Sequence, residues 1–385
     1  MVIARQKNIN VLHLMRTYGV NGGEQQLSQL FASNNKENVN ETFAFLFKDD
    51  ECSELFWKRA RHLRQISLSQ KSRKAGLAWG EFFLLLPYLL VFQWRLWKLL
   101  RKLQTDVCVV HGFQASLVAW PLAIINRQKG WAYVHRTTKQ TNRLTMIFRF
   151  LYAPFDVVAG NSQAVMASLK PYVRPSKLSV LENGINIESF DVVRQHRTEP
   201  FPSIDGNILI SVGRLIPSKG HSILLDALSS VLVHYPKTKL WIVGEGPERE
   251  SLENKIRQKD LSDHVVLLGQ RHDVPALLAE ATIFVSASER EGMSNAVLEG
   301  MASGLAAVVG DAPGVSECHI NGLTGLVVDR NPEALAKGIC ELLGNPGRIE
   351  YFGQQSRAHV KEKYSIQASR KRYDALYEVL VGEKS

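Results

Sequence analysis

The sequence predicts an α/β protein with two domains, each built around a parallel β-sheet. Short apolar runs alternate with helical patterns along the 385 residues, with few interruptions from Asn207 onward. The chain is long enough for two hydrophobic cores, and 45% hydrophobic with 22% charged residues is typical of globular proteins. The polar, proline-containing run at 194–206 indicates a linker between the domains.

Lysine and arginine gather in the first half of the chain. Residues 1–190 hold 25 of them against 12 acids, a net charge of +13, whereas the remainder holds 22 against 25, a net charge of −3. Such a basic surface can attract nucleic acid, an acidic glycan or an anionic membrane. The sequence has no aromatic-interleaved nucleic-acid motif, so we expect no nucleic-acid partner and favour a membrane or a polyanionic acceptor.

The cysteines and the first residues indicate a cytoplasmic protein. Cys52, Cys108, Cys318 and Cys340 have neither the spacing of a metal site nor that of a disulfide framework, which fits a reducing compartment. Residues 1–10 lack the apolar core of an export signal, so we do not expect export.

The first strand, Ile9 to Met15, leads into a glycine-containing loop and then into a helical pattern from Gln25 to Phe31. Gly22 and Gly23 in this loop would let the backbone approach a ligand closely. The loop lacks the G-x-G-x-x-G spacing, so a dinucleotide site is only weakly indicated. An ordinary strand-to-helix turn is the alternative.

The stretch Phe82–Leu103 has the most unusual composition of the chain. Its first part, up to Trp94, carries no charge but is shorter than the ~20 residues that a membrane-spanning helix needs. Further along, Arg95, Lys98 and Lys102 share one helical face with leucines displaced from them, the pattern of a helix in a membrane interface. A helix that buries its leucines in a core would show the same pattern. We predict peripheral membrane contact through the basic first domain and this stretch.

Two later strands of the first half end in residues that could contact a ligand. His111 follows the buried strand 106–110, and Arg136 closely follows the strand 131–134. Ligands bind at the carboxyl ends of strands in open α/β sheets. A lone histidine is more often structural than catalytic, and Arg136 would suit either an anionic acceptor or a solvated loop.

In the second half, two carboxylates surround a strand, loop and helix pattern. The strand 282–285 precedes Glu291, and Glu299 lies further along in the following helix, which opens near Gly292 and Ser294. The first N–H groups of a helix lack partners and favour an anion, so this is the outline of a phosphate site. Carboxylates accept hydrogen bonds from paired hydroxyls. An ordinary α/β unit with solvated acids is the alternative.

Another strand-to-helix loop carries two cations, Arg214 and Lys219. Two fixed cations can neutralise a pyrophosphate and stabilise the charge that grows on it when a sugar leaves. A solvated loop would contain the same residues.

Several segments of the second half occur together in the order of a known family. They are Gly213–Gly220, Gly244–Pro247, Gly269–Asp273 and the stretch around Glu291 and Glu299. With these motifs the chain resembles glycosyltransferase family four, the retaining enzymes of the GT-B fold. The resemblance is close over most of residues 205–330 and looser in the first half. Pro313 replaces a glycine of the family's G-G-x-x-E segment, which puts the backbone contact there in doubt.

The resemblance implies the α/β GT-B fold class, with two Rossmann-like parallel-sheet domains that face each other across a cleft. An N-terminal acceptor-binding domain would cover 1–192, a linker 193–206 and a nucleotide-sugar-binding domain 207–365. The C-terminal helix, 366–385, would pack back on the first domain.

The same resemblance implies the roles of the candidate residues. Arg214 and Lys219 would hold the donor diphosphate, while Glu299 would bind the ribose. Glu291 would contact the sugar hydroxyls and His111 would lie beside the reacting sugar, so these two are the candidate catalytic residues. The other expected contacts are Gly292, Met293 and Ser294 in the donor loop, Gln270 and Arg271 beside the base, and Arg16, Gly22, Gly23 and Arg136 at the acceptor or phosphate loop.

The expected function is that of a retaining hexosyltransferase in polysaccharide or lipopolysaccharide biosynthesis. It would move a sugar from a UDP- or GDP-linked donor to a lipid-linked or cell-envelope saccharide at the cytoplasmic face of the membrane. The sequence has no D-x-D metal pair, so we expect neither a metal nor another cofactor. Two alternatives stay open: a sugar-nucleotide epimerase of the same architecture, and a non-catalytic glycan- or lipid-binding subunit.

Overall fold

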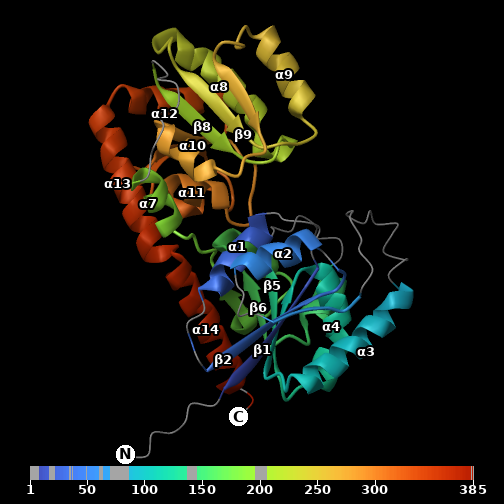
Figure 1. The fold of residues 1–385 in the computed structure, drawn as a ribbon. Helices are drawn as coiled ribbons and strands as arrows, with labels where there is room; N and C mark the ends of the chain where they lie inside the picture. The colour runs from blue at the N-terminus through green and yellow to red at the C-terminus, as the bar shows by residue number, and fades with distance from the viewer. Residues whose placement is uncertain are drawn as a thin grey trace, which may run out of the picture. The chain divides into compact units, whose positions relative to one another are not determined.

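The computed structural model describes residues 8–16, 22–33, 36, 38–48, 50–59, 64–69, 86–136, 145–195, 206–382 and 384. The chain forms two compact units, and Figure 1 shows the elements of each. Unit 1 comprises Met1–Gly184 and Ile366–Ser385, and unit 2 comprises Ile185–Ser365. Within the described ranges, no helix is both long and apolar enough to cross a bilayer.

Unit 1 is a seven-stranded parallel sheet in the order β3-β2-β1-β4-β5-β6-β7. Its strands are β1 Ile9–Met15, β2 Val39–Phe45, β3 Arg64–Ser67, β4 Val107–His111, β5 Gly130–His135, β6 Val157–Gly160 and β7 Leu178–Val180. Its helices are α1 Gly22–Ala32, α2 Asp50–Arg59, α3 Leu86–Lys102, α4 Phe113–Ile125, α5 Thr145–Tyr152, α6 Gln163–Leu169 and α14 Ile366–Gly382, with a 3₁₀ turn at Pro175–Lys177. β4, β5 and β6 are buried along their whole length, which explains their continuous apolar sequences.

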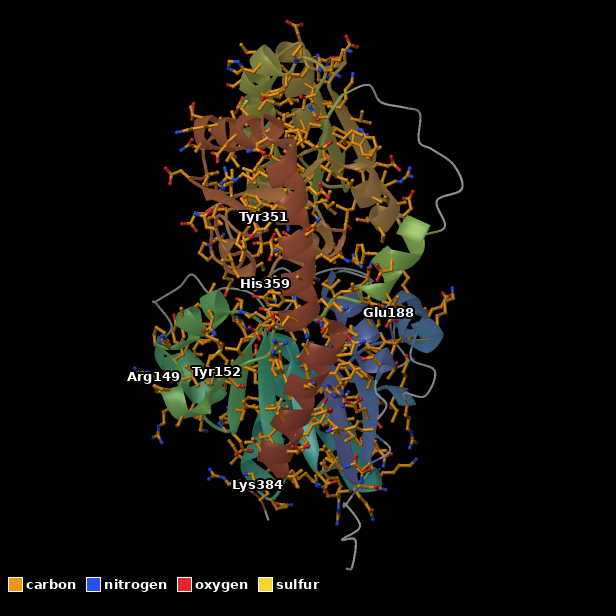
Figure 2. The ribbon with its side chains drawn as sticks, turned by 90° about the vertical axis from the view of Figure 1, so that its left-hand side faces the viewer. Arg149, Tyr152, Glu188, Tyr351, His359 and Lys384 are labelled. Atoms are coloured by element: carbon orange, nitrogen blue, oxygen red, sulfur yellow. The ribbon has the colours of Figure 1, made fainter. Side chains whose placement is uncertain are left out.

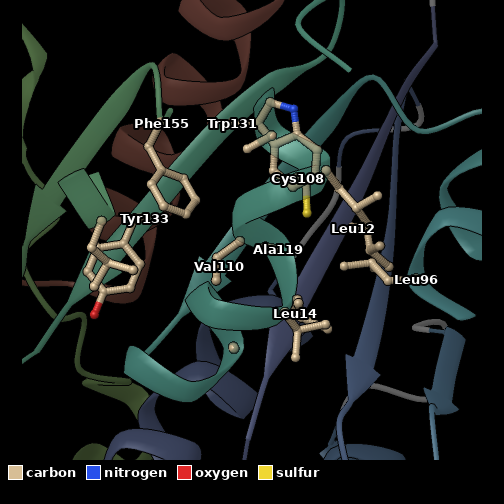
Figure 3. Packing of buried hydrophobic residues seen from close by; sticks show 14 of the residues in the cluster. Leu12, Leu14, Leu96, Cys108, Val110, Ala119, Trp131, Tyr133 and Phe155 are labelled. Carbon is tan, nitrogen blue, oxygen red and sulfur yellow. The ribbon is translucent and has the colours of Figure 1, made fainter. Parts of the chain in front are cut away.

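Different helices cover the two faces of this sheet. One hydrophobic cluster lies under α3, α4, α5 and α6, and the other lies under α1, α2 and α14. Figure 3 shows part of the first cluster, where Leu96 of α3 lies near Leu12 and Leu14 of β1. In the second cluster, Tyr373 and Tyr377 of α14 are buried. The end of the chain therefore completes the core of unit 1.

Helix α3 buries the leucines that the sequence analysis assigned to a membrane interface. Leu96 and Leu100 are 0% and 1% exposed and belong to the first cluster. Leu90 and Trp94 lie on the solvent side of the same helix and are 74% and 53% exposed. The leucine stripe is thus core, because α3 must cover the apolar face of the sheet. Residues 82–85 lie outside the described residues.

Unit 2 is a six-stranded parallel sheet in the order β10-β9-β8-β11-β12-β13. Its strands are β8 Ile208–Val212, β9 Lys239–Val243, β10 Val265–Gly269, β11 Ile283–Ser286, β12 Ala306–Gly310 and β13 Gly325–Val328. Its helices are α7 Glu188–Gln195, α8 His221–His234, α9 Arg249–Gln258, α10 Val274–Glu280, α11 Asn295–Ala302, α12 Pro332–Leu343 and α13 Pro346–Lys363, with 3₁₀ turns at Pro217–Lys219 and Ser316–Cys318. α8, α9 and α12 enclose one cluster, and α7, α10 and α11 border the other.

The boundary between the units differs from the predicted one. It lies between Gly184 and Ile185 instead of after residue 192. Ile185 and Phe190 are buried among residues of unit 2, and α7 packs on α10, so this segment is part of the second core. α7 also covers the first residues of the predicted linker, and residues 196–205 lie outside the described residues.

Each sheet has a topological switch point, where the strand order reverses. In unit 1 the order runs outward from β1 to β3 on one side and from β4 to β7 on the other. In unit 2 it runs from β8 to β10 and from β11 to β13. Ligands of open α/β sheets bind at the carboxyl ends of the strands at such a point. The predicted site residues of each unit lie at its switch point. Arg16 follows β1 and His111 ends β4, while Lys219 and Glu291 follow β8 and β11.

Candidate functional site

The switch point of unit 2 brings together two loops that are far apart in the sequence. The loop at 213–220 follows β8 and contains Arg214 and Lys219, and the loop at 287–294 follows β11 and contains Glu291. β8 and β11 are neighbouring strands, so both loops emerge at the same point of the sheet edge.

Main-chain contacts fix the two loops against each other. The amide of Glu289 donates a hydrogen bond to the carbonyl of Ser218 at 2.7 Å. Gly220 has a φ of +69°, and a Cβ atom there would lie 2.1 Å from the carbonyl oxygen of Ala287. Both the left-handed conformation and the close approach require glycine at position 220.

The predicted cations of this site differ in their surroundings. The Lys219 ammonium forms an ion pair with the Glu291 carboxylate, and the two side chains are 20% and 17% exposed. The Arg214 side chain is exposed and has no hydrogen bond or ion pair with any residue that the structure describes. The site therefore offers one cation that a carboxylate holds in place and a second one that can meet an anion directly.

The loop after Glu291 is tied to a neighbouring turn and opens into α11. The Glu291 amide donates to the carbonyl of Pro313 at 2.9 Å, and the Ser294 amide donates to that of Gly314 at 3.0 Å. Proline at 313 keeps this contact, because the contact uses the carbonyl group alone. Ser294 is the N-cap residue of α11, yet its side chain accepts no capping hydrogen bond. The amides of the first turn of α11 are thus not capped by Ser294 and point toward an anion position.

Glu299 lies in the second turn of α11 without a cationic partner. Burial raises the pKa of its carboxyl group to about 7. This carboxylate has no hydrogen bond or ion pair with the described residues. Hydroxyl groups that donate to this carboxylate would stabilise its charged form.

The other predicted donor residues lie at different depths. Gln270 and Arg271 are exposed at the end of β10, the edge strand next to β9. Arg271 donates to both carboxylate oxygens of Asp273 at 2.8 and 2.5 Å, so its charge is already balanced. Gly292 is half-buried, and Met293 is buried in the hydrophobic cluster beneath the loop. Their contacts with a donor stay predictions.

In the described part of the chain, no group of three or more His, Cys, Asp or Glu residues could hold a metal ion. Cys108 and Cys318 are buried free thiols, and burial raises the pKa of Cys318 to about 12.

In unit 1, the ring of His111 at the end of β4 lies against the ring of His13 in β1. The distance between His111 Nε2 and His13 Nδ1 is 3.0 Å, and both side chains are buried. Burial lowers the pKa of both rings. The two histidines are therefore neutral at physiological pH.

A chain of hydrogen bonds determines which nitrogen of His111 carries the proton. Burial raises the pKa of Glu41, but the hydrogen bond with His13 and the charge of Arg370 outweigh this, and the net pKa is lowered. Glu41 is thus ionised, and the Tyr377 hydroxyl donates to it at 2.8 Å. The Tyr377 oxygen then accepts from His13 Nε2 at 3.1 Å, so His13 Nδ1 accepts the proton of His111 Nε2.

This tautomer leaves Nδ1 of His111 as a hydrogen-bond acceptor. The atom is buried and has no partner among the described residues. A buried acceptor without a partner is costly, and a hydroxyl group would satisfy it. His111 is therefore suited to accept a hydrogen bond from a substrate hydroxyl.

Arg16, Gly22 and Gly23 lie beside the same switch point. Arg16 directly follows β1, and its guanidinium lies 5.0 Å from the centre of the Phe47 ring. Gly22 and Gly23 begin α1, and a side chain at position 23 would meet no atom within 4 Å. Packing with the described residues thus does not explain this glycine, whereas close approach of a ligand to the helix start would.

Arg136 is held inside unit 1. It donates to Gln26 of α1 at 2.9 Å and to the Tyr373 hydroxyl of α14 at 3.2 Å. The alternative of a solvated loop is therefore wrong for this side chain. An acceptor contact through Arg136 stays a prediction.

The residues that support His111 were not predicted from the sequence. Arg370 of α14 donates to both oxygens of Glu41 in β2, at 2.8 and 2.9 Å, although the two residues are 329 positions apart. One feature of the sequence could have indicated them. His13 and Glu41 lie inside strands that are otherwise apolar, and buried ionisable groups are rare unless they are paired. Their partners on α14 were too distant in the sequence to identify.

Two parts of the chain match models of glycosyltransferase families. Residues 59–189 match the family described as "Glycosyltransferase Family 4", and residues 194–359 match "Glycosyl transferases group 1". The chain belongs to glycosyltransferase family four. This confirms the resemblance on which the site assignment is based.

Curated glycosyltransferases resemble this chain over part of their length. An uncharacterised glycosyltransferase of Haemophilus influenzae is 31% identical over 43% of this chain and 47% of its own. A GDP-mannose-dependent α-(1-6)-phosphatidylinositol monomannoside mannosyltransferase of Mycolicibacterium smegmatis is 26% identical over 65% of this chain and 64% of its own. A UDP-Gal:α-D-GlcNAc-diphosphoundecaprenol α-1,3-galactosyltransferase of Escherichia coli is 26% identical over 61% and 65%. The chain thus spans about half to two thirds of the length of these relatives.

Solved structures show the same fold. HepE of Anabaena, in complex with UDP, has a TM-score of 0.78 at 18% identity, covering 96% of this chain and 100% of its own. Sucrose-phosphate synthase of Thermosynechococcus elongatus has a TM-score of 0.78 at 19% identity, covering 98% and 100%. Together with the two parallel sheets, these likenesses confirm the predicted GT-B fold class.

We predict that His13 and His111 are both neutral at physiological pH and that neither ring titrates near pH 6.5, the ordinary value for histidine. Nitrogen NMR of histidine-labelled protein should show His111 protonated at Nε2, and a His13→Gln variant would assign the signals. Below about pH 6.5, both histidines bind protons in the unfolded chain but not in the folded protein. The free energy of unfolding should therefore fall as the pH drops below that value. Titration of either ring near pH 6.5 would refute the hydrogen-bond chain.

Proposed function

We propose that the chain is a retaining glycosyltransferase that moves a hexose-type sugar from a nucleoside-diphosphate sugar to a lipid-linked or cell-envelope saccharide. The observation that carries this proposal is the switch point of unit 2, where Lys219, Glu291 and the start of α11 lie together. Such a site matches a ligand with a diphosphate at one end of its sugar and hydroxyl groups around it. Membership of family four supports the reaction class.

In this proposal the diphosphate binds to Lys219, Arg214 and the first amides of α11. Binding draws Lys219 away from Glu291, and the released carboxylate accepts hydrogen bonds from the sugar hydroxyls. As the glycosidic bond breaks, charge grows on the leaving diphosphate, and the fixed cations and helix dipole stabilise it. Transfer therefore needs no divalent metal.

The sugar and the ribose contact the other carboxylate and the histidine. Glu299 accepts from the ribose hydroxyls, and its charged form is stabilised as it does so. His111 accepts a hydrogen bond from a hydroxyl of the reacting sugar, and Glu291 stabilises an oxocarbenium-like transition state. The sugar is transferred with retention of its anomeric configuration, as the family does.

The acceptor is a saccharide on a lipid, and the protein works as a peripheral protein at the cytoplasmic face of the membrane. The names of two relatives support a lipid-linked acceptor, since one acts on a phosphatidylinositol mannoside and the other on a sugar-diphosphoundecaprenol. Their donors are GDP-mannose and UDP-galactose, so the donor proposed here is UDP- or GDP-linked. The basic charge of the first half supports contact with an anionic membrane.

The transfer assay for this proposal combines the purified protein, a panel of UDP- and GDP-hexoses, and diphosphoundecaprenol-linked saccharides, in buffer with EDTA. We expect a new glycosidic bond with the anomeric configuration of the donor. Arg214→Gln should lower turnover by about 100-fold, because one charge that stabilises the leaving diphosphate is lost. Arg214 is exposed and unpaired among the described residues, so this variant should fold normally.

The control for this assay is Arg257→Gln, which removes an equally exposed guanidinium from α9. It should leave turnover unchanged. Isomerisation of the donor without an acceptor would support the epimerase instead. Turnover that requires divalent cations would contradict the proposed role of the two basic residues.

Glu299 gives a pH dependence to donor binding. Its pKa of about 7 means that the carboxyl group is largely protonated one unit below that pH and must ionise to accept both ribose hydroxyls. The affinity for a nucleotide sugar should therefore rise by up to about tenfold between about pH 6 and about pH 8. Calorimetry of the wild type and Glu299→Gln would measure it, and the variant should bind weakly at every pH. A pH-independent wild-type affinity would remove Glu299 from the ribose.

A further inference from the structure

The helices on one face of unit 1 contain no acidic residue. α3, α4, α5 and α6 lack aspartate and glutamate altogether, whereas α1, α2 and α14 on the other face each carry at least one. Residues 86–180 contain 13 lysines and arginines but only two acids, Asp106 and Asp156. Figure 1 shows α3 beside α4, and these helices pack on each other. The positive charge of unit 1 is thus not balanced on this face.

The same face carries most of the exposed large apolar side chains. Of thirteen such side chains among the described residues, eight lie on α3, α4 and α5. Ile125, Ile147 and Phe150 are 71%, 59% and 65% exposed. Phe150 is joined to α4 through its carbonyl, which accepts from Trp120 Nε1 at 3.1 Å. A surface whose helices lack acidic residues and that combines apolar side chains with cations matches the interface of an anionic bilayer.

A basic pocket of about 820 Å³ adjoins these apolar side chains. Its lining includes five cations, which are Arg127, Arg149, Lys170, Arg174 and Lys177. Figure 2 shows Arg149 and Tyr152, the two residues of α5 that line the pocket. Arg149 is followed in α5 by the exposed Phe150, and Arg127 lies two residues after the exposed Ile125, so cations of the pocket are close in the chain to exposed apolar side chains.

Two of the five cations have structural roles and three do not. Arg149 and Lys177 donate hydrogen bonds to main-chain carbonyl groups, at 3.1 Å for Arg149 and at 2.6 and 2.9 Å for Lys177. Arg127, Lys170 and Arg174 are exposed and have no hydrogen bond or ion pair with the described residues. Three charges of the pocket are therefore available to a ligand.

The electrostatics of Lys177 show that like charges crowd the pocket. Burial lowers its pKa, Asp156 opposes this, and Arg174, Lys384 and Arg127 lower it further. Asp156 is itself paired with Lys384 at 2.9 Å. An anionic group in the pocket would relieve this repulsion.

The pocket lies at the opposite edge of the sheet from His111. Arg127 precedes β5 and Lys177 precedes β7, whereas His111 ends β4 and Arg16 follows the end of β1. In a parallel sheet, these are the amino and the carboxyl ends of the strands. An anion in the pocket would therefore leave the ligand edge of unit 1 open.

We propose that this surface docks unit 1 on an anionic lipid bilayer, with a lipid phosphate in the pocket and Ile125, Ile147 and Phe150 in the headgroup region. The inference rests on the proposed function for the presence of a lipid-borne acceptor. It replaces Leu96, Leu99 and Leu100 of α3, which are buried, with a different set of membrane contacts. The occupant is a bilayer, because a soluble phosphate would gain nothing from the apolar side chains around the pocket.

The test is sedimentation of the full chain with vesicles of phosphatidylcholine alone or mixed with phosphatidylglycerol. We expect binding to the anionic vesicles that weakens with added salt. The triple variant Arg127→Gln, Lys170→Gln, Arg174→Gln should bind them about 100-fold more weakly, at about 1 kcal/mol for each charge. The double variant Ile125→Ser, Ile147→Ser should also weaken binding, because both isoleucine side chains leave water when the protein binds the bilayer.

The matched control removes three exposed, unpaired lysines elsewhere, by Lys337→Gln, Lys361→Gln and Lys371→Gln. Equal loss of binding in the control would overturn the proposal, since net charge alone would then explain it. Binding of inorganic phosphate by the pocket without binding of anionic vesicles would overturn it too. Circular dichroism would show that all variants are folded.

The proposed function fails separately from this inference. Nucleotide-sugar binding by the triple variant should equal that of the wild type, because unit 2 is unchanged. Wild-type protein that transfers sugar but ignores anionic vesicles would refute the docking surface alone. Wild-type protein that binds the vesicles through the pocket but transfers no sugar would refute the transferase alone.

Discussion

The ion pair between Lys219 and Glu291 joins the two loops that emerge at the switch point of unit 2, and the candidate site is arranged around it. The pair is partly buried, so the loops must hold both side chains in place through contacts of their own. Gly220 against Ala287 and the Glu289 amide on Ser218 provide this on one side. A diphosphate can compete for a cation placed in this way without rearranging the backbone, which is what preorganised stabilisation of a leaving group requires.

Unit 1 uses buried charge for a different purpose. Arg370 and Glu41 pair inside the core, where an ion pair adds little net stability but would be costly to break. The chain of hydrogen bonds that starts from this pair fixes the proton of His111 on Nε2 and exposes the lone pair of Nδ1. The last helix, α14, therefore contributes to the candidate site through Tyr377, although it is far from β1, β2 and β4 in the sequence.

Much of the fold was predictable because it depends on local patterns. Continuous apolar runs such as 107–111 identify buried parallel strands, and glycine-rich loops after them identify the strand ends. The boundary at Ile185 was not predictable, because the segment looks like a continuation of the first domain until its packing on α10 is known. The leucines of α3 were ambiguous for a similar reason, since amphipathic patterns do not distinguish a sheet from a membrane as the apolar partner.

The residues of the candidate site were predictable only where a single short sequence motif contains them. Arg214, Lys219, Glu291 and Glu299 follow from short motifs, and the structure places the first three at one switch point. The partners of His111 were missed because they come from β1, β2 and α14, and no sequence spacing reports such a contact. The basic pocket was missed for the same reason, since its five cations come from three separate segments of the chain.

Calorimetric titration of UDP and GDP into the protein in EDTA tests the central claim most directly. The account predicts that one of the two nucleotides binds without divalent cations, and that Lys219→Gln weakens this binding by at least about tenfold, because a charge on the diphosphate loses its partner. Absence of binding by either nucleotide in EDTA, or unchanged affinity in Lys219→Gln, would contradict it.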